Sequence, residues 1–476
     1  MSGTEPAGHQ LRPPADVERI GARAQRPASP GTGRWARSPY AVAGIATGVL
    51  VLGLGLLTGR ADVALLGVPL LVGAVWTGRP GAWGAPPPAT PARAELAADD
   101  RPATPGELTA TLILDPPPAA ELVLARVSAP GHRPTVVVLP AGRRALDLRL
   151  HTVRTGPQRT FRGDVQAIAG GGTTVSDAST VTAPDRIVLP TAMPLGRVPL
   201  PRRLQGLTGP HTARRLGDGD ELRDVHPFTP GDRLRRVDWR TTARRSPDLE
   251  TLYVRRTYAT AEATAVLVLD SRDDVGPDLR TWRGTGTQRV DEATSLDLAR
   301  HAAASVAGAL VAAGDRVGLE DLGRSRHPLP PASGRRHLRR VLHALALSRA
   351  VGSPARRLRP PRLPADAIVY LFTTALDDEP LAMVRAWHAH GHQVVVVDTL
   401  PDVRPATEEH MRMAWRVTRM EREDRLRRLA AEGVPVVRWA GRARETAPVV
   451  LETLVRAAER HAGAPPPPRV STGGHR

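Results

Sequence analysis

An alternation of strand and helix patterns between residues 265 and 439 constrains the fold of this chain more than any other feature. Continuous apolar runs such as AVLVLD are typical of strands that are buried on both faces of a parallel sheet. Such runs occur at 265–270, 315–322, 366–374, 392–400 and 434–439. Helical patterns separate them at 292–313, 333–347, 378–390 and 407–432, with Ser333 as the expected cap of the second helix. The alternation predicts a doubly wound α/β domain, which we assign to residues 263–462.

The chain upstream of this domain has a different texture. Between residues 106 and 200, short runs such as TVVVL and ALDLRL are separated by turn clusters such as DPPP and PAGR. Several short strands at this spacing predict a small β-sandwich. Residues 78–105 are rich in Pro and Ala and have no apolar period, so we expect a linker there. Polar, Pro-rich composition predicts disordered tails at 1–37 and 463–476.

Two apolar runs near the N-terminus are candidates for membrane helices. The run from Ser38 to Thr58 has no charge, and a bilayer core requires about 20 such residues. A polar break at 59–62 precedes a second apolar run from Val63 to Thr77. The simplest interpretation is a transmembrane hairpin over residues 38–77, with a Gly-x-x-x-Gly packing motif at Gly44–Gly48. A signal peptide and a soluble pair of Gly-rich helices are the alternatives.

The distribution of arginine predicts the orientation of this hairpin. Only Arg60 lies in the connecting loop, whereas several arginines flank the outer sides of the two runs. These are Arg12, Arg19, Arg23, Arg26, Arg34 and Arg37 before the first run, and Arg79, Arg93 and Arg101 after the second. Positively charged flanks tend to stay in the cytoplasm. We therefore expect a multi-pass protein of the cell membrane with both termini and the large domain in the cytoplasm.

Composition narrows the range of functions. The chain has 476 residues and a net charge of +18, and all of its 66 basic residues are arginine. Nucleic-acid binding through arginine is therefore one alternative, but aromatic residues are only 3% of the chain and offer few surfaces for stacking bases. The richness in Ala, Gly, Pro and Arg also fits a GC-rich coding bias. The absence of Cys excludes disulfides, thiolate metal sites and Cys nucleophiles.

The stretch from 217 to 244 combines many charges of both signs with turn and helix signals. Pro230-Gly231 suits the central positions of a type II turn, because Gly accepts the positive φ that this turn requires. Asp232 follows as the expected N-cap of one short helix, DRLRRVDWR. Arg235 and Asp238 lie three residues apart in that helix and are expected to pair. Trp239 is expected to anchor the loop against apolar surface.

The order of these residues resembles the signature of the bacterial domain of unknown function 58 (DUF58) family. The matching site residues are Glu221, Arg223, Asp224, Phe228, Gly231, Asp232, Arg235, Asp238, Trp239 and Arg244, with Val225, Val237, Thr242 and Ala243 in the same register. The resemblance covers about residues 200–445, with the signature segment at 201–262. Family members usually carry Arg-x-Tyr where this chain has His226 and Phe228, so that the Arg and the Tyr hydroxyl are both missing here.

The resemblance also implies a von Willebrand factor A-like domain after the signature. The first strand of such a domain often ends in Asp-x-Ser-x-Ser, and its oxygens help to bind a divalent cation. Here Arg272 and Asp274 stand at the two Ser positions after Asp270, and Thr374 stands where a later Asp is expected. Because a guanidinium opposes a cation, we expect a degraded site with no metal or cofactor, in which Arg272 pairs with Asp270.

The same resemblance implies an interaction protein rather than an enzyme. Members of the family are typically encoded beside MoxR-type AAA+ ATPases and are thought to act with them in chaperone-like assembly or envelope maturation. We therefore expect a membrane-tethered scaffold whose signature segment faces a partner or joins the two domains through ion pairs. An enzyme that uses the Asp/Arg cluster is the alternative. Neighbouring arginines lower carboxylate pKa values, however, and leave no obvious base near neutral pH.

Overall fold

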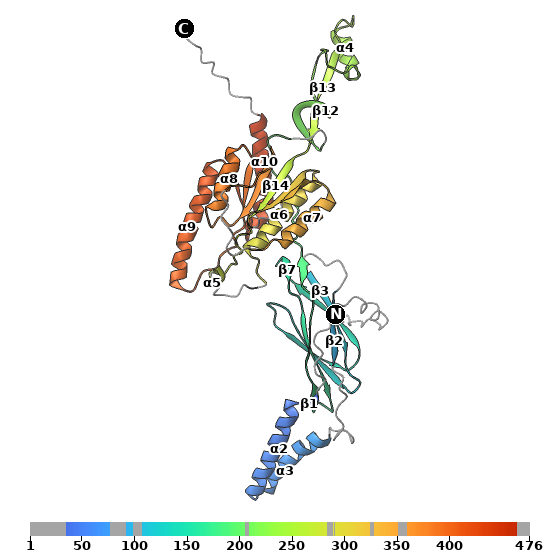
Figure 1. Ribbon diagram of the computed structural model, residues 1–476, viewed down its shortest axis with the longest axis vertical. Coiled ribbons are helices and arrows are strands. Elements are labelled where there is room, and N and C mark those ends of the chain that lie inside the picture. Colours follow the sequence, from blue (N-terminus) through green and yellow to red (C-terminus); the bar gives the residue numbers. More distant parts are fainter. Residues whose placement is uncertain are drawn as a thin grey trace, which may run out of the picture. The chain divides into compact units, whose positions relative to one another are not determined.

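The computed structural model describes residues 35–76, 92–98, 107–204, 209–282, 289, 291–323, 328–350 and 359–463. This part of the chain is mixed α/β, as the sequence predicts (Figure 1). It divides into two compact units, one of residues 1–152 and 157–186 and the other of residues 153–156 and 187–476. The predicted tails before residue 35 and after residue 463, and most of the predicted linker, lie outside the described residues.

Two apolar helices begin the first unit. Helix α2 (Pro39–Leu57) starts where Ser38 caps it, since the Ser38 Oγ accepts a hydrogen bond from the Ala41 N–H at 3.1 Å. Helix α3 (Ala61–Trp76) packs against α2. Among the described residues, α2 is the one helix long and apolar enough to cross a membrane, and α3 contains a shorter apolar stretch.

Glycines allow α2 and α3 to approach closely, but of the predicted motif only Gly48 takes part. A Cβ on Gly67 would lie 2.6 Å from the Gly48 oxygen, and a Cβ on Gly55 would lie 2.3 Å from the Ala64 nitrogen. Gly44 has no atom within 4 Å of its Cβ position, so its predicted packing role is wrong. The helices cross where Gly48, Gly55 and Gly67 bring the two backbones together, which a side chain at these positions would prevent.

Antiparallel sheets form the rest of the first unit. One contains, in order, β1 (Trp35–Arg37), β9 (Thr174–Ser176), β8 (Arg162–Ala169), β4 (Leu122–Ser128) and β5 (Thr135–Pro140), and β10 (Ser179–Thr182) pairs with β8. The other contains β2 (Arg93–Ala98), β3 (Glu107–Asp115) and β6 (Arg144–His151). The two sheets contact each other at Gly163, where an added Cβ would lie 3.4 Å from the Leu112 side chain. A separate pair is formed by β7 (Gly156–Gln158) and β11 (Arg186–Val188).

Two strands of these sheets correct the predicted boundaries. Trp35–Arg37 belongs to the predicted disordered tail but pairs with β9, and Arg93–Ala98 belongs to the predicted linker but pairs with β3. Neither segment has the apolar alternation of an independent strand. Each is a strand because its backbone groups complete a sheet edge, which the distant β9 supplies for β1 and the next strand along the chain, β3, supplies for β2.

A six-stranded sheet forms the centre of the second unit. Its order is β16 (Leu329–Ala332), β15 (Arg316–Asp321), β14 (Thr264–Leu269), β17 (Ile368–Thr373), β18 (Val394–Asp398) and β19 (Val436–Arg438). All neighbours are parallel except β16, which is antiparallel to β15. The chain moves outward in one direction from β14 and in the other from β17. Open α/β sheets bind ligands outside the carboxyl ends of the strands at such a switch point.

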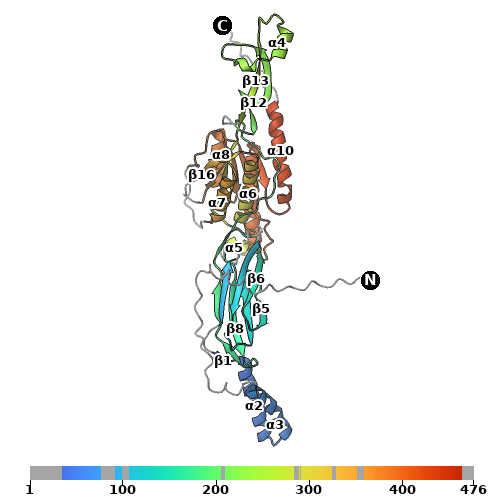
Figure 2. The same cartoon turned by 90° about the vertical axis from the view of Figure 1, so that its right-hand side faces the viewer.

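Helices cover both faces of this sheet (Figure 2). α6 (Ser295–Ala312), α7 (Arg335–Leu347) and α10 (Ala443–Gly463) contribute Leu310, Leu345 and Leu451 to one buried core. α8 (Glu379–Ala389) and α9 (Glu409–Ala431) contribute Leu381, Trp387 and Leu429 to the core on the other face. A short helix, α5 (Leu279–Trp282), precedes α6. The predicted alternation of strands and helices is therefore confirmed.

Local predictions failed in two places within this unit. β16 has the sequence LPPA and was not predicted, because proline weakens any strand signal and is tolerated only at a sheet edge. The predicted Ser333 cap is also wrong. The N-cap of α7 is Gly334, which has φ of 91°. Glycine has no side chain, so no side-chain hydrogen bond caps the helix.

The signature segment is a long antiparallel hairpin, where the sequence indicated a loop. β12 (His211–Pro227) pairs with β13 (Tyr253–Ala261), and the hairpin tip carries a 3₁₀ turn, η3 (Leu234–Arg236), and helix α4 (Trp239–Arg245) (Figure 1). Register shifts beside Gly217 accommodate the GDGD sequence, which has low strand propensity. At the hairpin base the His211 Nε2 lies 2.8 Å from Asp315 Oδ1, and that oxygen also accepts a hydrogen bond from the Ala263 N–H at 3.0 Å.

Candidate functional site

A tight turn begins the tip of the β12–β13 hairpin. The predicted turn at Pro230-Gly231 is present, since the Asp232 N–H donates to the Thr229 oxygen at 3.0 Å and Gly231 has φ of 104°. Asp232 does not cap a helix as predicted. Its Oδ2 accepts hydrogen bonds from the Thr229 N–H at 2.9 Å and the Thr229 hydroxyl at 2.8 Å, which closes the turn. These hydrogen bonds hold the pKa of Asp232 below its ordinary value.

The predicted single helix is divided into η3 and α4. The division lies at Asp238, whose Oδ1 caps α4 by accepting a hydrogen bond from the Thr241 N–H at 3.0 Å. This bond holds the pKa of Asp238 below its ordinary value. The buried Thr242 hydroxyl accepts from the Tyr253 N–H at 2.9 Å, and Val237 forms a β-bridge with Val254. The tip is therefore attached to β13 through side chains as well as backbone.

Two further predictions for this tip are wrong. Arg235 does not pair with Asp238, because the capping position directs Asp238 toward the backbone of α4 and to within 3.9 Å of Arg255. Arg235 lies instead 3.8 Å from Asp218, a carboxylate that also pairs with Arg233 and Arg236. Trp239 is not a buried anchor: 63% of it is exposed, because it is the first residue of α4 and Val237 takes the buried position before it.

The remaining signature residues lie along the same hairpin without converging on one point. Glu221, Arg223 and Asp224 are exposed on β12, where Arg223 Nε lies 3.8 Å from Asp224 Oδ2. Phe228 is half-buried, and its N–H donates to the Leu252 oxygen at 2.7 Å. Arg244 is exposed on α4, and no hydrogen bond or ion pair of its side chain occurs within the described part of the chain. The signature residues therefore lie along the surface of the hairpin rather than around a single point.

The guanidinium of Arg272 lies at the carboxyl end of β14, where the sequence predicted a degraded cation site. Arg272 donates to Asp270 from Nε at 2.8 Å and from Nη2 at 3.2 Å, so the predicted pairing is present. Arg272 Nη2 also donates to Asp377 at 3.0 Å, and Nη1 lies 3.1 Å from Glu379. Burial alone would lower the pKa of Arg272, but the hydrogen bonds and charge of Asp270 and then of Asp377 raise it above its ordinary value.

Other groups at this edge of the sheet are also engaged. Asp274 turns away from Asp270 and accepts a hydrogen bond from the Leu296 N–H at 3.3 Å. The Thr374 carbonyl accepts from Arg422 Nε at 2.7 Å, and Arg422 also pairs with the buried Asp398 at the end of β18. Within the described ranges, no three or more His, Cys, Asp and Glu side chains are grouped so that they could hold a metal ion. Arginine–carboxylate pairs therefore stand at the carboxyl ends of β14 and β18.

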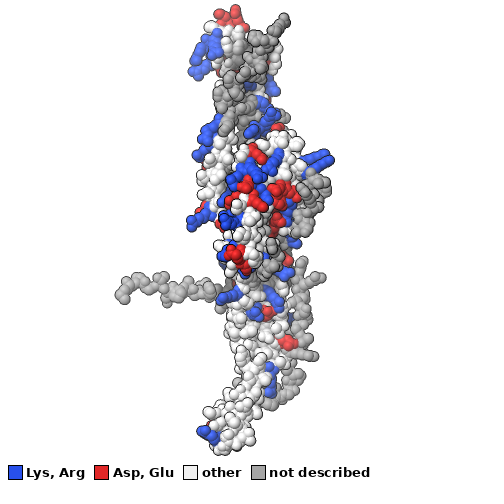
Figure 3. Space-filling model, turned by 90° about the vertical axis from the view of Figure 1, so that its left-hand side faces the viewer, with Lys and Arg blue, Asp and Glu red and all other residues white. Residues whose placement is uncertain are grey.

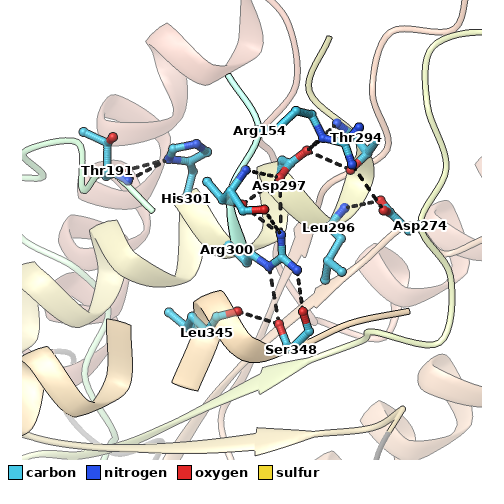
Figure 4. Close-up of polar contacts among 11 residues, drawn as sticks. Arg154, Thr191, Asp274, Thr294, Leu296, Asp297, Arg300, His301, Leu345 and Ser348 are labelled. Carbon is cyan, nitrogen blue, oxygen red and sulfur yellow. Dashed lines mark hydrogen bonds and ion pairs between the residues drawn. The ribbon is translucent and has the colours of Figure 1, made fainter. Parts of the chain in front are cut away.

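A second buried network, which the sequence did not indicate, surrounds Asp297 near the start of α6 (Figure 4). Asp297 Oδ1 accepts from the Thr155 N–H at 2.8 Å and from the Thr155 hydroxyl at 2.6 Å. Arg154 Nε lies 2.6 Å from Asp297 Oδ2. Arg300 Nη1 donates to the Thr155 carbonyl at 3.0 Å, and Arg300 Nη2 donates to the Ser348 carbonyl. Segment 153–156 is thereby joined to α6 and to the end of α7.

The two carboxylates in this network have opposite pKa shifts. Burial would raise the pKa of Asp297, but the charge of Arg154, the Thr155 hydrogen bonds and the charge of Arg300 hold it below its ordinary value. Burial raises the pKa of Asp274 above its ordinary value. A capping box is the one sequence signal that could have indicated part of the network, since the Thr294 N–H and hydroxyl both donate to Asp297 Oδ2 at the start of α6. No sequence pattern indicated that Arg154 and Arg300 belong to this network.

Comparison with protein-family models gives one match, over part of the chain. Residues 224–421 match the family model described as "Protein of unknown function DUF58". The match begins in β12 at Asp224, includes the hairpin tip, and ends in α9 at Glu421. The comparisons with curated proteins and with solved structures gave no match.

Proposed function

We propose that this chain, whose residues 224–421 match the DUF58 family model, is an interaction protein that presents the hairpin tip to a MoxR-type AAA+ ATPase. Its role would be chaperone-like assembly or envelope maturation, with the protein tethered to the membrane. The observation that carries this proposal is the exposure of large apolar side chains on a tip with a fixed structure. Leu234 is 67% exposed and Trp239 is 63% exposed.

The composition of the tip supports a protein partner. Exposed apolar residues grouped on one element mark interaction sites more often than scattered ones do. Trp and Arg are the residues that most often dominate binding energy at interfaces, and Arg244 lies on the same short helix as Trp239. The turn closed by Asp232 and the cap at Asp238 fix the shape of the tip before binding, which lowers the entropic cost of association.

Enzymatic use of the Asp/Arg cluster has less support. Hydrogen bonds hold the pKa values of Asp232 and Asp238 below their ordinary values, so both are charged acceptors at neutral pH rather than bases near their pKa. Both carboxylates are also committed to backbone N–H groups of the tip. We therefore place them in the scaffold of the surface and not in catalysis.

We also propose that α2 and α3 form a transmembrane hairpin with both ends in the cytoplasm. Apart from their mutual contact, the two helices expose large apolar side chains that water solvates poorly, including Leu50, Leu54, Leu57, Leu65, Leu66 and Val72. The positive flanks favour the cytoplasmic orientation. A reporter that is active only outside the cytoplasm, fused to the C-terminus, should be inactive, and activity there would reject this topology.

The α/β domain is, in this proposal, a von Willebrand factor A-like domain whose cation site has been replaced by an ion pair. The sheet order with one antiparallel edge strand and the position of Asp270 after the first central strand support this assignment. Arg272 then supplies the positive charge that a divalent ion would supply elsewhere, through contacts to Asp270, Asp377 and Glu379. The partner would therefore be bound without a bridging metal ion.

A capture experiment tests the interaction. The full-length protein in detergent, immobilised through its C-terminus, should retain a purified MoxR-type AAA+ ATPase. A double variant, Trp239→Ala with Arg244→Ala, should lose this capture at an unchanged melting temperature, since both side chains are exposed. The matched control removes exposed side chains from α9, as Met420→Ala with Arg416→Ala, and should retain capture. Full capture by the tip variant would reject the tip as the interface.

A further inference from the structure

A cavity beside α7 has apolar walls and a basic rim. It lies between α7, β15 and β16 and has a volume of about 740 Å³. Binding pockets for ligands commonly have volumes of roughly 300–1,000 Å³. Its walls include Leu269, Leu319, Leu329 and Leu347. Arg336, Arg339, Arg340 and His343 line it from one face of α7 (the helix and β16 are labelled in Figure 2).

The arginines of α7 are not compensated by acidic residues of their own helix. α7 has the sequence RRHLRRVLHALAL, which contains no Asp or Glu. Arg335, Arg336, Arg339 and Arg340 are exposed, and in the part of the chain that the structure describes none of them makes an ion pair. Among the described residues, Asp321 is the one carboxylate that lines the cavity, and it already accepts hydrogen bonds from the Ser271 hydroxyl and from the Gly323 N–H.

This arrangement opposes the stability of the helix. Arg335 and Arg339, like Arg336 and Arg340, are like charges four residues apart, which repel each other on a helix surface. Arg335 and Arg336 also lie in the first turn, where the helix dipole favours negative charge. An anionic partner would relieve both the repulsion between the arginines and the unfavourable positive charge in the first turn. For a helix that only faces solvent, these charges lower stability without any compensation.

Helix α9 shows what a solvated charged helix of this protein looks like. Its arginines alternate with acidic residues, and blue and red side chains are interspersed on the face of the α/β domain in Figure 3. Ion pairs three or four residues apart join Arg412 to Glu409, Arg419 to Glu423, Arg425 to Glu421 and Arg427 to Asp424. The unpaired charge of α7 is therefore not a general consequence of the arginine-rich composition.

We propose that the cavity beside α7 binds an acidic peptide segment of a partner protein, with apolar side chains in the cavity and carboxylates on Arg336, Arg339 and Arg340. From Arg336 to His343 the basic face extends over two helical turns, roughly 11 Å of axis, which suits several successive carboxylates. The edge strand β16 contains Pro330 and Pro331, so the peptide cannot bind by adding a strand there. Recognition must come from side chains.

This site is separate from the hairpin tip, and a fluorescence-polarisation experiment tests it on the full-length protein. The probe is a short labelled peptide of Glu and Leu in helical alternation. One control peptide has Gln in place of each Glu, and another has Ser in place of each Leu. The Glu/Leu peptide should bind with an affinity that falls with salt, and both control peptides should bind at least about tenfold more weakly.

Charge-removing variants locate the binding. Arg336→Gln with Arg340→Gln should weaken binding of the Glu/Leu peptide by about tenfold, because two ion pairs are lost. The matched control, Arg412→Gln with Arg416→Gln, removes two exposed arginines at the same spacing from α9 and should bind like the wild type. The tip variant Trp239→Ala should also bind normally, so failure of this proposal and failure of the proposed function give different results.

Three outcomes would overturn the inference. Equal loss in the α7 and α9 variants would mean that only net charge matters. Equal binding of the Glu/Leu and Glu/Ser peptides would mean that the apolar cavity is not used. Displacement of the probe by soluble short-chain phosphatidylserine, but not by unlabelled Glu/Leu peptide, would reassign the basic face to lipid headgroups.

Discussion

The Arg272 guanidinium donates to the Asp270 carboxylate at 2.8 Å, and less than a tenth of either side chain is exposed to solvent. The pair stands at the carboxyl end of the first central strand, where the switch point of the sheet would otherwise leave an open crevice. Asp377 and Glu379 add a second and a third carboxylate to the same guanidinium. One arginine thus holds together the loops after β14 and β17.

Removal of this arginine should be costly and should create a cation requirement. Arg272→Ser leaves the buried Asp270 without its partner, and loss of one member of a buried pair typically costs about 3–5 kcal/mol. Mg²⁺ should restore part of the lost melting temperature of the variant, because Asp270, Asp377 and Glu379 then lose the cation that they share, but should not change that of the wild type. Thermal unfolding with Mg²⁺ or EDTA measures this, with the exposed pair variant Arg280→Ser as a control. A Mg²⁺ effect on the wild type would contradict the closed site.

Substitutions at the hairpin tip should affect stability at the capping residue Asp238 but not at the exposed Trp239. Asp238→Ala removes the cap of α4 and should lower the melting temperature, whereas Asp238→Asn keeps an acceptor oxygen and should restore most of it. Trp239→Ala should change the free energy of unfolding by less than about 0.5 kcal/mol, because the side chain is mostly exposed. Differential scanning calorimetry of the three variants measures these effects. A large loss of stability in Trp239→Ala would mean that the ring is packed in solution.

The Asp297 network should make stability depend on pH. Folding lowers the pKa of Asp297, so its contribution is fully present above the unfolded value of about 3.9 and is lost as the pH falls through the folded pKa. Folding raises the pKa of Asp274, so this group opposes folding at neutral pH and does so less as the pH falls through its folded value.

Urea unfolding of two matched variants tests these signs. Asp297→Asn should destabilise at pH 7 by about 3–5 kcal/mol, because Arg154 and Arg300 lose their buried counterion, and should flatten the loss of stability toward acid. Relative to the wild type, Asp274→Asn should lower the free energy of unfolding less at pH 7 than in acid. Parallel pH profiles for the two variants would show that the carboxylates do not have opposite shifts.

The crossing of α2 and α3 should tolerate no side chain at its closest point. Gly55→Val would place a Cβ 2.3 Å from the Ala64 backbone and should separate the helices, whereas Gly44→Val meets no atom within 4 Å and should be neutral. Spin labels on cysteines introduced at the exposed positions Leu50 and Leu66 report the separation, because the cysteine-free chain carries no other label. An equal distance between the labels in both Val variants would contradict the crossing.

The sequence by itself determined the elements whose side chains repeat at a fixed period. The run Ala265–Leu269 is apolar throughout, and Val394–Asp398 is apolar at every position but the last, so burial on both faces identified them as central strands. The Pro230-Gly231 turn and the pairing of Arg272 with Asp270 were also predictable from the sequence. In each case the required partners lie within a few residues of one another.

Tertiary structure decided what depends on residues far apart in the chain. β1 and β2 are strands only because β9 and β3 offer unpaired backbone groups, and β12 is a strand only because β13 lies beside it. Asp297 is buried by Arg154 and Thr155, which lie more than a hundred residues away, and no local pattern encodes that contact. Trp239 faces solvent because the cap at Asp238 sets where α4 begins. Local composition specifies period and turns, whereas burial and pairing follow from the packing of distant segments.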